Sequence, residues 1–477
     1  MIPLPATRGA KIAVLGLGKS GLAAARALKA AGADLRAWDD SERARAAALA
    51  EGLAVADLGG PALNGAEMLV MSPGIPHSFP KPHPVAARAK AAGLALVCDI
   101  ELLLHAQSAA QFIGITGTNG KSTTTALLGH IFAEARRRVA VGGNLGPAAL
   151  GLEALGAGGA YLLELSSYQI ELIRTATFDI AVLLNITPDH LDRHGGMDGY
   201  IAAKRRLFDL QLQRGTAVIG VDDDHCRAIA AELAGRNNLR VVPVSSAGKV
   251  AGGVYVIDGK LYDDSERRDA FIVDLAAAKA LPGSHNWQNA AAAYAAASAA
   301  GIHRDVIVRA LLGYPGLPHR QETAAVIDGV VFVNDSKATN AEATAKALVC
   351  YDAIYWIAGG LAKEGGIESL EPLHGRIRHA FLIGKAADDF AAAIEGKVAY
   401  TKSGNLATAV VRAAAMAREE KIAGAVVLLS PACASFDQFI NFEARGDAFR
   451  DLVQGMTRRD GENGTNGMRA DAPAGRP

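Results

Sequence analysis

Cysteine is scarce in this sequence: the 477 residues include four, namely Cys98, Cys226, Cys350 and Cys433. None of them has a second cysteine at the short spacing of a zinc site, and four widely separated thiols do not make a disulfide framework. Both of those classes are therefore excluded. Such sparse cysteines are typical of a protein from a reducing compartment, so we expect a cytoplasmic protein.

The sequence also lacks an excess of charge and a long apolar run. Lysine plus arginine and aspartate plus glutamate both number 49, which gives a formal net charge of zero, so nothing indicates a nucleic-acid binder driven by phosphate electrostatics. No apolar run reaches about 18 residues, which argues against a membrane span. The first apolar run, 12–17, lies between Lys11 and Lys19 and ends in a glycine turn, unlike a signal peptide.

Apolar residues are abundant and make up 50% of the chain, enough to build large cores. At ~150 residues per domain, the length suggests about three domains. Strand-like and helix-like segments alternate, a pattern typical of α/β folds with doubly wound parallel sheets. We predict a Rossmann-like domain over 1–99, a central phosphate-loop domain over 100–316, a second Rossmann-like domain over 317–459, and a disordered tail over 460–477.

A glycine-rich segment, Gly114–Thr125, is central to the interpretation of this sequence. The apolar run 111–113 precedes it and a helix-like run follows, which is the strand–loop–helix context of a phosphate-binding loop. Its glycines would let backbone N–H groups surround phosphate oxygens, Lys121 could reach the terminal phosphates, and the Ser122 hydroxyl could bind Mg²⁺. Five residues, where the common motif has four, separate Gly114 from Gly120.

A second glycine-rich turn, Gly16–Gly21, also lies between a predicted strand and an alanine-rich helix. The next predicted strand ends at Asp39 and Asp40, about where dinucleotide-binding folds place a ribose-binding acid. This pattern alone would indicate an NAD-dependent enzyme. However, it is a weak motif when isolated, and a dehydrogenase would leave Lys121 and Glu164 unexplained.

Several other predicted strands end in polar residues. Strand 138–141 is followed by Asn144, strand 161–163 ends at Glu164, and strand 180–184 precedes His190. Ligands of open α/β sheets bind at the carboxyl ends of the strands, so these side chains are candidates for one site, and Glu164 is suited to binding Mg²⁺. Taken alone, His190 could equally be a solvated loop histidine.

Two helix-like segments carry further candidates, each with a plain alternative. Lys204 lies in the basic segment 200–208, whose default interpretation is a solvated face. Asn286 and Asn289 are three residues apart at the start of an alanine-rich helix and therefore share one face. They could also be surface amides near a helix cap.

Together these motifs resemble the Mur ligases, ATP-dependent enzymes that add amino acids during peptidoglycan synthesis. The resemblance covers residues 11 to about 455, and the segments 334–340 and 430–443 are similar to the D-glutamate-adding branch of that family. It implies an enzyme, expected to be monomeric, that joins D-glutamate to UDP-N-acetylmuramoyl-L-alanine through an acyl phosphate and a tetrahedral intermediate, using ATP and two Mg²⁺ ions.

The resemblance also implies roles for individual residues. The catalytic residues would be Lys121, Glu164, His190 and Lys204. The ATP-binding residues would be Gly117, Thr118, Asn119, Gly120, Lys121, Ser122, Thr123, Asn286, Asn289, Arg320 and Asp335. The UDP substrate would contact Ser20, Asp39, Asp40, Ser72 and Asn144, and the amino acid Lys337, Thr339, Lys363, Ser435 and Phe442. Magnesium would be bound by Ser122, Glu164, His190 and Lys204, the lysine that the family carbamylates.

Two further alternatives remain at this point. One is an ATP-binding switch without catalysis, although the polar strand ends of the third predicted domain argue against it. The other is a sister ligase or a folylpolyglutamate-type ligase with a different acceptor. Phosphate release that depends on one particular amino acid would distinguish among them.

Overall fold

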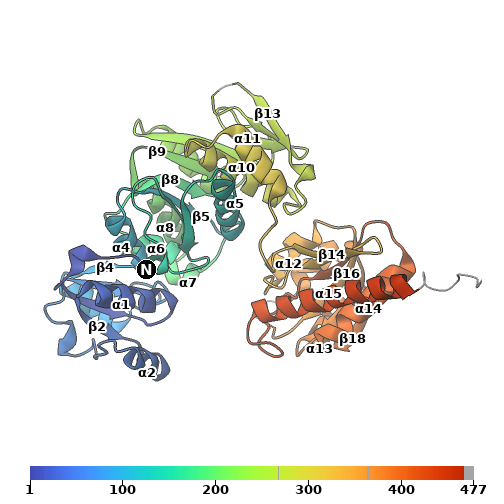
Figure 1. The fold of residues 1–477 in the computed structure, drawn as a ribbon, viewed down its shortest axis with the longest axis horizontal. Helices are drawn as coiled ribbons and strands as arrows, with labels where there is room; N and C mark the ends of the chain where they lie inside the picture. The colour runs from blue at the N-terminus through green and yellow to red at the C-terminus, as the bar shows by residue number, and fades with distance from the viewer. Residues whose placement is uncertain (267, 363–365, 467–477) are drawn as a thin grey trace, which may run out of the picture. The chain divides into compact units, whose positions relative to one another are not determined.

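The structure, a computed structural model, describes residues 1–266, 268–362 and 366–466. The chain divides into two compact units, Met1–Tyr314 and Pro315–Pro477. Three β-sheets with helices between their strands make up the described residues (Figure 1). Each unit has its own hydrophobic cores. The predicted α/β class is confirmed.

The first sheet has parallel strands in the order β2-β1-β3-β4. Its elements are β1 (Lys11–Leu15), α1 (Lys19–Ala31), β2 (Asp34–Trp38), α2 (Glu42–Ala50), β3 (Met68–Met71), α3 (Pro84–Ala91), β4 (Ala95–Val97) and α4 (Asp99–Ala106). The turn after β1 requires glycine, because a Cβ at Gly21 would lie 1.8 Å from the carbonyl oxygen of Gly16. The helix α1 therefore packs directly against the end of β1.

The second sheet, within the described residues, has the strand order β13-β12-β11-β10-β9-β8-β5-β7-β6. Its strands are β5 (Gln111–Thr116), β6 (Val139–Gly143), β7 (Ala160–Glu164), β8 (Phe178–Leu183), β9 (Gln211–Gly220), β10 (Leu239–Ser245), β11 (Val254–Ile257), β12 (Lys260–Asp263) and β13 (Ala270–Asp274). Neighbours from β11 to β6 are parallel, whereas β12 is antiparallel to β11 and β13. Strands β11 and β12 form a hairpin that turns at Asp258 and Gly259.

Helices cover both faces of this second sheet, so alternate residues of one strand enter different cores. On β5, Ile113 and Ile115 pack in a core with α5 (Lys121–Glu134), α10 (Ser284–Ala299) and α11 (Arg304–Gly313). The neighbouring Phe112 belongs to a core that also includes residues of the first sheet. The helices on that side are α6 (Ser167–Glu171), α8 (Met197–Asp209) and α9 (Asp224–Ala234), and a short helix α7 (Leu191–His194) precedes α8. The shared core explains why the first two sheets form one unit.

The third sheet belongs to the second unit and has the order β14-β15-β19-β16-β17-β18. Its elements are β14 (Glu322–Ile327), β15 (Val330–Asn334), α12 (Ala341–Leu348), β16 (Ala353–Gly359), β17 (Ile377–Ile383), α13 (Ala387–Ile394), β18 (Tyr400–Gly404), α14 (Leu406–Glu420), β19 (Ala425–Leu429) and α15 (Phe442–Asn466). All pairs are parallel except the edge pair of β14 with β15. The sequence interpretation did not include this antiparallel edge strand.

The last helix extends further than the sequence suggests. Phe449 and Val453 are fully buried and anchor α15, and the helix then continues to Asn466, past residue 457, where the apolar pattern ends. Once a helix is anchored, each further residue adds one hydrogen bond at small cost, so polar residues can extend it. The remainder of the predicted tail, 467–477, lies outside the described residues.

Candidate functional site

The segment between β5 and α5 forms a tight loop held by its neighbours. Gly117 and Gly120 have positive φ angles of 151° and 83°, and a Cβ at Gly120 would lie 2.2 Å from Oδ1 of Asn289. The backbone N–H of Asn119 donates to Oδ1 of Asn185 at 2.8 Å, from the segment after β8. The loop therefore requires glycine and is shaped by contacts from the segment after β8 and from α10.

The side-chain nitrogens of two lysines meet at this loop. Nζ of Lys121 donates to the carbonyl oxygens of Gly117 and Thr118 at 2.8 and 2.7 Å. Nζ of Lys204, on α8, donates to the same Gly117 carbonyl at 2.9 Å and lies 4.6 Å from the centre of the Tyr200 ring. Burial, together with the nearby charge of Lys121, holds the pKa of Lys204 well below its ordinary value. Lys204 is 1% exposed, so it is not part of a solvated basic face.

The end of β7 places a buried carboxylate beside this loop. Nδ2 of Asn144 donates to Oε1 of Glu164 at 2.6 Å. The other oxygen, Oε2, is buried and has no hydrogen-bond partner among the described residues. An unpartnered buried acceptor costs free energy unless a cation or donor binds it, so Glu164 is a candidate cation ligand.

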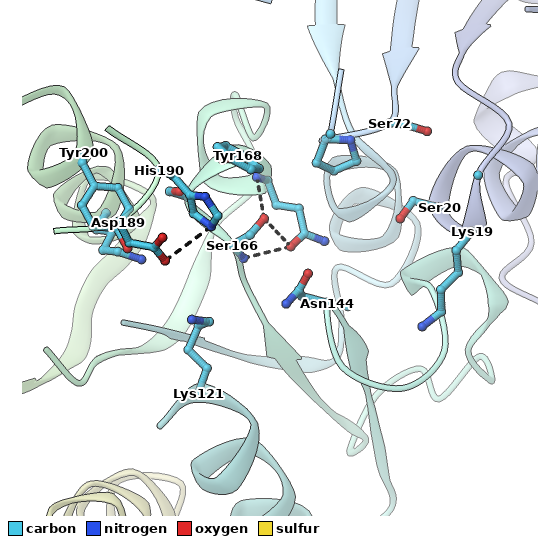
Figure 2. A pocket seen from close by; sticks show the side chains of 17 residues that line it. Lys19, Ser20, Ser72, Lys121, Asn144, Ser166, Tyr168, Asp189, His190 and Tyr200 are labelled. Carbon is cyan, nitrogen blue, oxygen red and sulfur yellow. Dashed lines mark hydrogen bonds and ion pairs between the residues drawn. The ribbon is translucent and has the colours of Figure 1, made fainter. Parts of the chain in front are cut away.

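The segment after β8 brings an imidazole to the same place. His190 has a positive φ of 52°, and its half-exposed ring lies with Nε2 3.4 Å from Oδ2 of Asp189. The ring centre lies 5.2 Å from that of Tyr168 on α6. Figure 2 shows His190, Tyr168 and Asp189 close together beside the pocket described next.

A pocket of about 430 Å³ in the first unit collects most of these groups (Figure 2). Its lining comprises Gly18, Lys19, Ser20, Ser72, Pro73, Gly74, Lys121, Gly143, Asn144, Ser166, Ser167, Tyr168, Gln169, Asp189, His190, Tyr200 and Lys204. The sequence interpretation placed Ser20, Ser72, Lys121, Asn144, His190 and Lys204 in a site, and they line this one pocket. It selected neither Lys19 nor Tyr168 nor Tyr200, although Lys19 lies inside the first glycine-rich turn.

Other sequence-predicted residues of the first unit make local contacts outside the pocket lining. Oδ2 of Asp39 accepts from the backbone N–H of Leu17 at 2.6 Å, so this acid holds the first glycine-rich turn. Asp40 bonds to Nε2 of His83 at 3.0 Å, and this contact lowers the pKa of the Asp40 carboxyl. The candidates on α10, Asn286 and Asn289, are buried rather than on the surface.

The amides on α10 bond to each other, with Nδ2 of Asn289 lying 3.3 Å from Oδ1 of Asn286. This contact leaves Oδ1 of Asn289 facing Gly120 of the phosphate loop. The pair therefore lies against the glycine-rich loop.

The second unit contains the remaining candidates. Oδ2 of Asp335 accepts from Oγ of Ser430 at 2.8 Å, and burial raises the pKa of Asp335 to about 7. Nζ of Lys337 lies 3.9 Å from the centre of the Phe442 ring, and Ser435 is 2% exposed. The predicted residues Arg320 and Thr339 are in this unit too, whereas Lys363 lies outside the described residues.

The loop after β5 is rich in glycine, and its lysine lines a pocket at the carboxyl edge of an α/β sheet. This arrangement is typical of nucleotide-binding enzymes. Comparison with known proteins identifies the family: the Mur ligase middle domain matches residues 115–297, and the MurD-like N-terminal domain of Mur ligases matches residues 10–98. This chain belongs to the Mur ligase family, whose members are ATP-dependent ligases. The resemblance inferred from the motifs is confirmed.

The curated relatives carry a specific name. A protein of Paramagnetospirillum magneticum, named UDP-N-acetylmuramoylalanine--D-glutamate ligase, is 55% identical over 95% of this chain and 98% of its own. A Rhodospirillum rubrum protein of the same name is 55% identical over 95% of this chain and 96% of its own. The match therefore spans both units.

Solved structures show the same fold at low identity. The UDP-N-acetylmuramate-alanine ligase MurC of Thermotoga maritima aligns with a TM-score of 0.57 and 16% identity, covering 94% of this chain and 99% of that one. MurF of Acinetobacter baumannii aligns with a TM-score of 0.55 and 21% identity, covering 74% and 79% of the two chains. Within the described residues, no helix is long and apolar enough to cross a membrane.

Proposed function

We propose that this chain is the ATP-dependent ligase that adds D-glutamate to UDP-N-acetylmuramoyl-L-alanine. The observation that carries the proposal is the pocket of the first unit, in which the phosphate-loop Lys121 meets Asn144, His190 and Lys204. Relatives that are 51–55% identical over nearly the whole chain, all named as this ligase, support the choice of substrates. We also propose that the enzyme is cytoplasmic and monomeric.

The reaction follows from the chemistry of the two substrates. A carboxylate is a poor electrophile, so the alanyl carboxylate attacks the γ-phosphorus of ATP and ADP leaves. The neutral amine of D-glutamate then adds to the acyl phosphate, and the tetrahedral intermediate collapses with loss of phosphate and of the amine proton. In this proposal Lys121, whose Nζ lies at the loop, and the loop N–H groups would stabilise charge on the transferring phosphoryl group.

Glu164, which accepts a hydrogen bond from the pocket residue Asn144, fits a magnesium ligand, on the evidence of its unpartnered Oε2. Among the described residues no three His, Cys, Asp or Glu side chains cluster, so the remaining ligands would be phosphate oxygens, water, Ser122 and a modified Lys204, with His190 at a second ion. Bound magnesium would supply positive charge to the phosphates. Glu164 would hold it, and Lys121 would orient the phosphoryl group.

Carbamylation of Lys204 would make it such a ligand. The reaction with carbon dioxide requires the neutral amine, and the lowered pKa of Lys204 favours that form. An anionic carbamate would attract a cation where an ammonium repels one. Residues 1–99 would then bind the UDP part of the substrate and 100–316 the ATP.

The second unit would contribute to nucleotide and amino-acid binding. In this proposal Arg320 and Asp335 contact the nucleotide, and the acceptor is bound by Lys337, Thr339, Lys363, Ser435 and Phe442. A D-glutamate carries two carboxylates, which match the cations and hydroxyl donors of this set. An acceptor with a second amine would instead meet like charge.

The test is a panel of acceptors with ATP and UDP-N-acetylmuramoyl-L-alanine, followed by phosphate release. We expect turnover with D-glutamate at least about 100-fold faster than with L-glutamate, meso-diaminopimelate or L-lysine, since losing one charged contact costs about 3 kcal/mol. Lys121→Ala, purified in parallel, should be inactive and controls for contaminating phosphatases. Faster turnover with another acceptor would overturn the choice of amino acid, and tight binding of NADH would revive the dehydrogenase alternative.

A further inference from the structure

A chain of four side chains leads from the edge of the first sheet to the pocket. Oγ of Ser167 lies 2.9 Å from Nε2 of His194, and Nδ1 of that ring lies 3.2 Å from Oε1 of Glu171. The second carboxylate oxygen, Oε2, lies 3.2 Å from Nε2 of His77, in the segment after β3. Ser167 lines the pocket, whereas the reaction described above uses none of the four.

The charge of Glu171 determines how protons are arranged along this chain. Burial opposes ionisation of Glu171, but the hydrogen bonds from His194 and His77 outweigh it and lower the pKa of the carboxyl to about 2. Glu171 is therefore a carboxylate at neutral pH and can only accept hydrogen bonds. It follows that Nδ1 of His194 carries a proton and donates it to Oε1.

Neighbouring rings fix the orientation of His194. Its side chain is fully buried, it stacks on Tyr168 with ring centres 5.3 Å apart, and Tyr200 lies at 5.3 Å, tilted by 48°. Beyond Tyr168 lie the guanidinium of Arg193, 4.7 Å from the ring centre, and the ring of His190. In the described part of the chain, the titratable groups that touch His194 are thus Glu171, Tyr168 and Tyr200, with His77 on the other side of the carboxylate.

The protonation of His194 then sets what Ser167 can offer to the pocket. In a neutral ring protonated at Nδ1, the atom Nε2 is an acceptor, so the Ser167 O–H donates to it and leaves the oxygen lone pairs toward the pocket. In an imidazolium, Nε2 donates to Oγ, and the hydroxyl proton turns outward. Neutral His194 makes Ser167 an acceptor, and protonated His194 makes it a donor.

We propose that Glu171 and His194 are positioning residues that hold the Ser167 hydroxyl as a hydrogen-bond acceptor for an N–H or O–H group of the muramoyl-alanyl part of the substrate. This inference rests on the proposed function for the identity of that substrate. The amides and sugar hydroxyls of the muramoyl-alanyl part are neutral donors, unlike its carboxylate and unlike the diphosphate of the UDP part. Ser166 and Tyr168, which flank Ser167 in sequence, are seen beside the pocket near His190 and Asn144 (Figure 2).

The experiment measures the dissociation constant of UDP-N-acetylmuramoyl-L-alanine from the full-length chain by calorimetry between pH 5.5 and 8. Acid favours the imidazolium form of any histidine, and in that form of the ring the Ser167 hydroxyl becomes a donor, so for the native chain we expect affinity to fall on acidification. Ser167→Ala should bind about 3- to 10-fold more weakly at pH 8, the usual value of one hydrogen bond, and should lose this pH dependence. The exposed serine of α10, changed in Ser298→Ala, is the matched control and should bind like the native chain.

Glu171→Gln gives a readout that a purely structural role would not produce. The amide removes the negative charge that faces Nδ1 of His194, so the pH profile of binding should differ from that of the native chain, whereas a purely structural loss would weaken binding equally at every pH. If Ser167→Ala bound with native affinity, or kept the native pH dependence because His190 caused it, the proposal would be overturned while the ligase function stood. If the native chain did not bind this substrate at all, the proposed function would fail as well.

Discussion

Glu164 combines a short bond from Asn144 with a second oxygen that lacks a partner among the described residues. We expect Glu164→Gln to raise the Mg²⁺ concentration for half-maximal phosphate release by at least about tenfold, because an amide is a weaker ligand than a carboxylate, and excess Mg²⁺ to restore part of the activity. Magnesium titrations of phosphate release would measure it. The exposed acid changed in Glu153→Gln is the control, and an unchanged magnesium requirement in Glu164→Gln would exclude this side chain as a ligand.

Lys204 is a buried amine that the proposed mechanism uses as a carbamate, so replacing it should lower activity. Lys204→Met should lose at least about 100-fold in turnover, and short carboxylic acids should restore part of the activity of Lys204→Ala by replacing the carbamate. The exposed basic residue of α9, changed in Arg227→Met, should remain active. Failure of rescue, together with ordinary lysine density in a crystal structure, would rule out the carbamate.

The same lysine should give the native chain a particular pH dependence of stability. The unfolded chain keeps its Lys204 proton up to an ordinary lysine pKa, whereas the folded chain loses it at a lower pH. The unfolded state then binds more protons between those two values, so this group makes the free energy of unfolding rise with pH in that window. Urea unfolding in bicarbonate-free buffer should show this rise in the native chain and a smaller one in Lys204→Met.

The sequence alone could predict the pocket residues that lie at strand ends, because parallel strands bring their carboxyl ends to one edge of the sheet. The sequence could not predict the hydrogen-bonded chain that runs through His194. Glu171 and His194 are 23 residues apart, and Ser167 and His194 are 27 apart, so no helical or strand spacing links them. Only the packing of α6 against the segment after β8 brings them together.

At the scale of single elements, we expect the residues of α15 before position 457 to contribute to stability and those after it to contribute little. A chain that ends at Thr457 keeps Phe449 and Val453 in the core, so we expect native turnover and a melting temperature within about 2 °C. Phe449→Ala should instead cost about 3–5 kcal/mol, since it leaves a cavity against α14. Thermal melts and phosphate release would measure both, and loss of folding on truncation would show that the segment after 457 is structural.

The elements themselves were predictable where local pattern and tertiary context agree. The apolar strand, glycine loop and helix around Lys121 carry mutually consistent signals. The sequence interpretation did not identify β9, whose first residues, Gln211–Arg214, are mostly polar and mostly exposed, or β14, an antiparallel edge strand that its pairing with β15 defines. For such strands the partner decides the structure, and the sequence shows no comparable local signal.

At the scale of the whole molecule, none of the hydrophobic cores formed by the described residues includes residues from both sides of position 315. The cores of the first unit end at Tyr314, and those of the second begin after it. We therefore expect the fragments 1–314 and 315–477 to fold separately, each with its own cooperative thermal transition. Calorimetry of the two fragments and of the intact chain would measure those transitions.

The separate fragments should also divide the function. Fragment 1–314 contains the whole lining of the pocket, so it should bind UDP-N-acetylmuramoyl-L-alanine within about threefold of the intact chain, a difference below 1 kcal/mol. Fragment 315–477 should not bind this substrate, and neither fragment alone should release phosphate on addition of D-glutamate, because the proposed acceptor residues and Lys121 are then in different molecules. Aggregation of fragment 1–314, or binding much weaker than that of the intact chain, would mean that the pocket depends on the second unit.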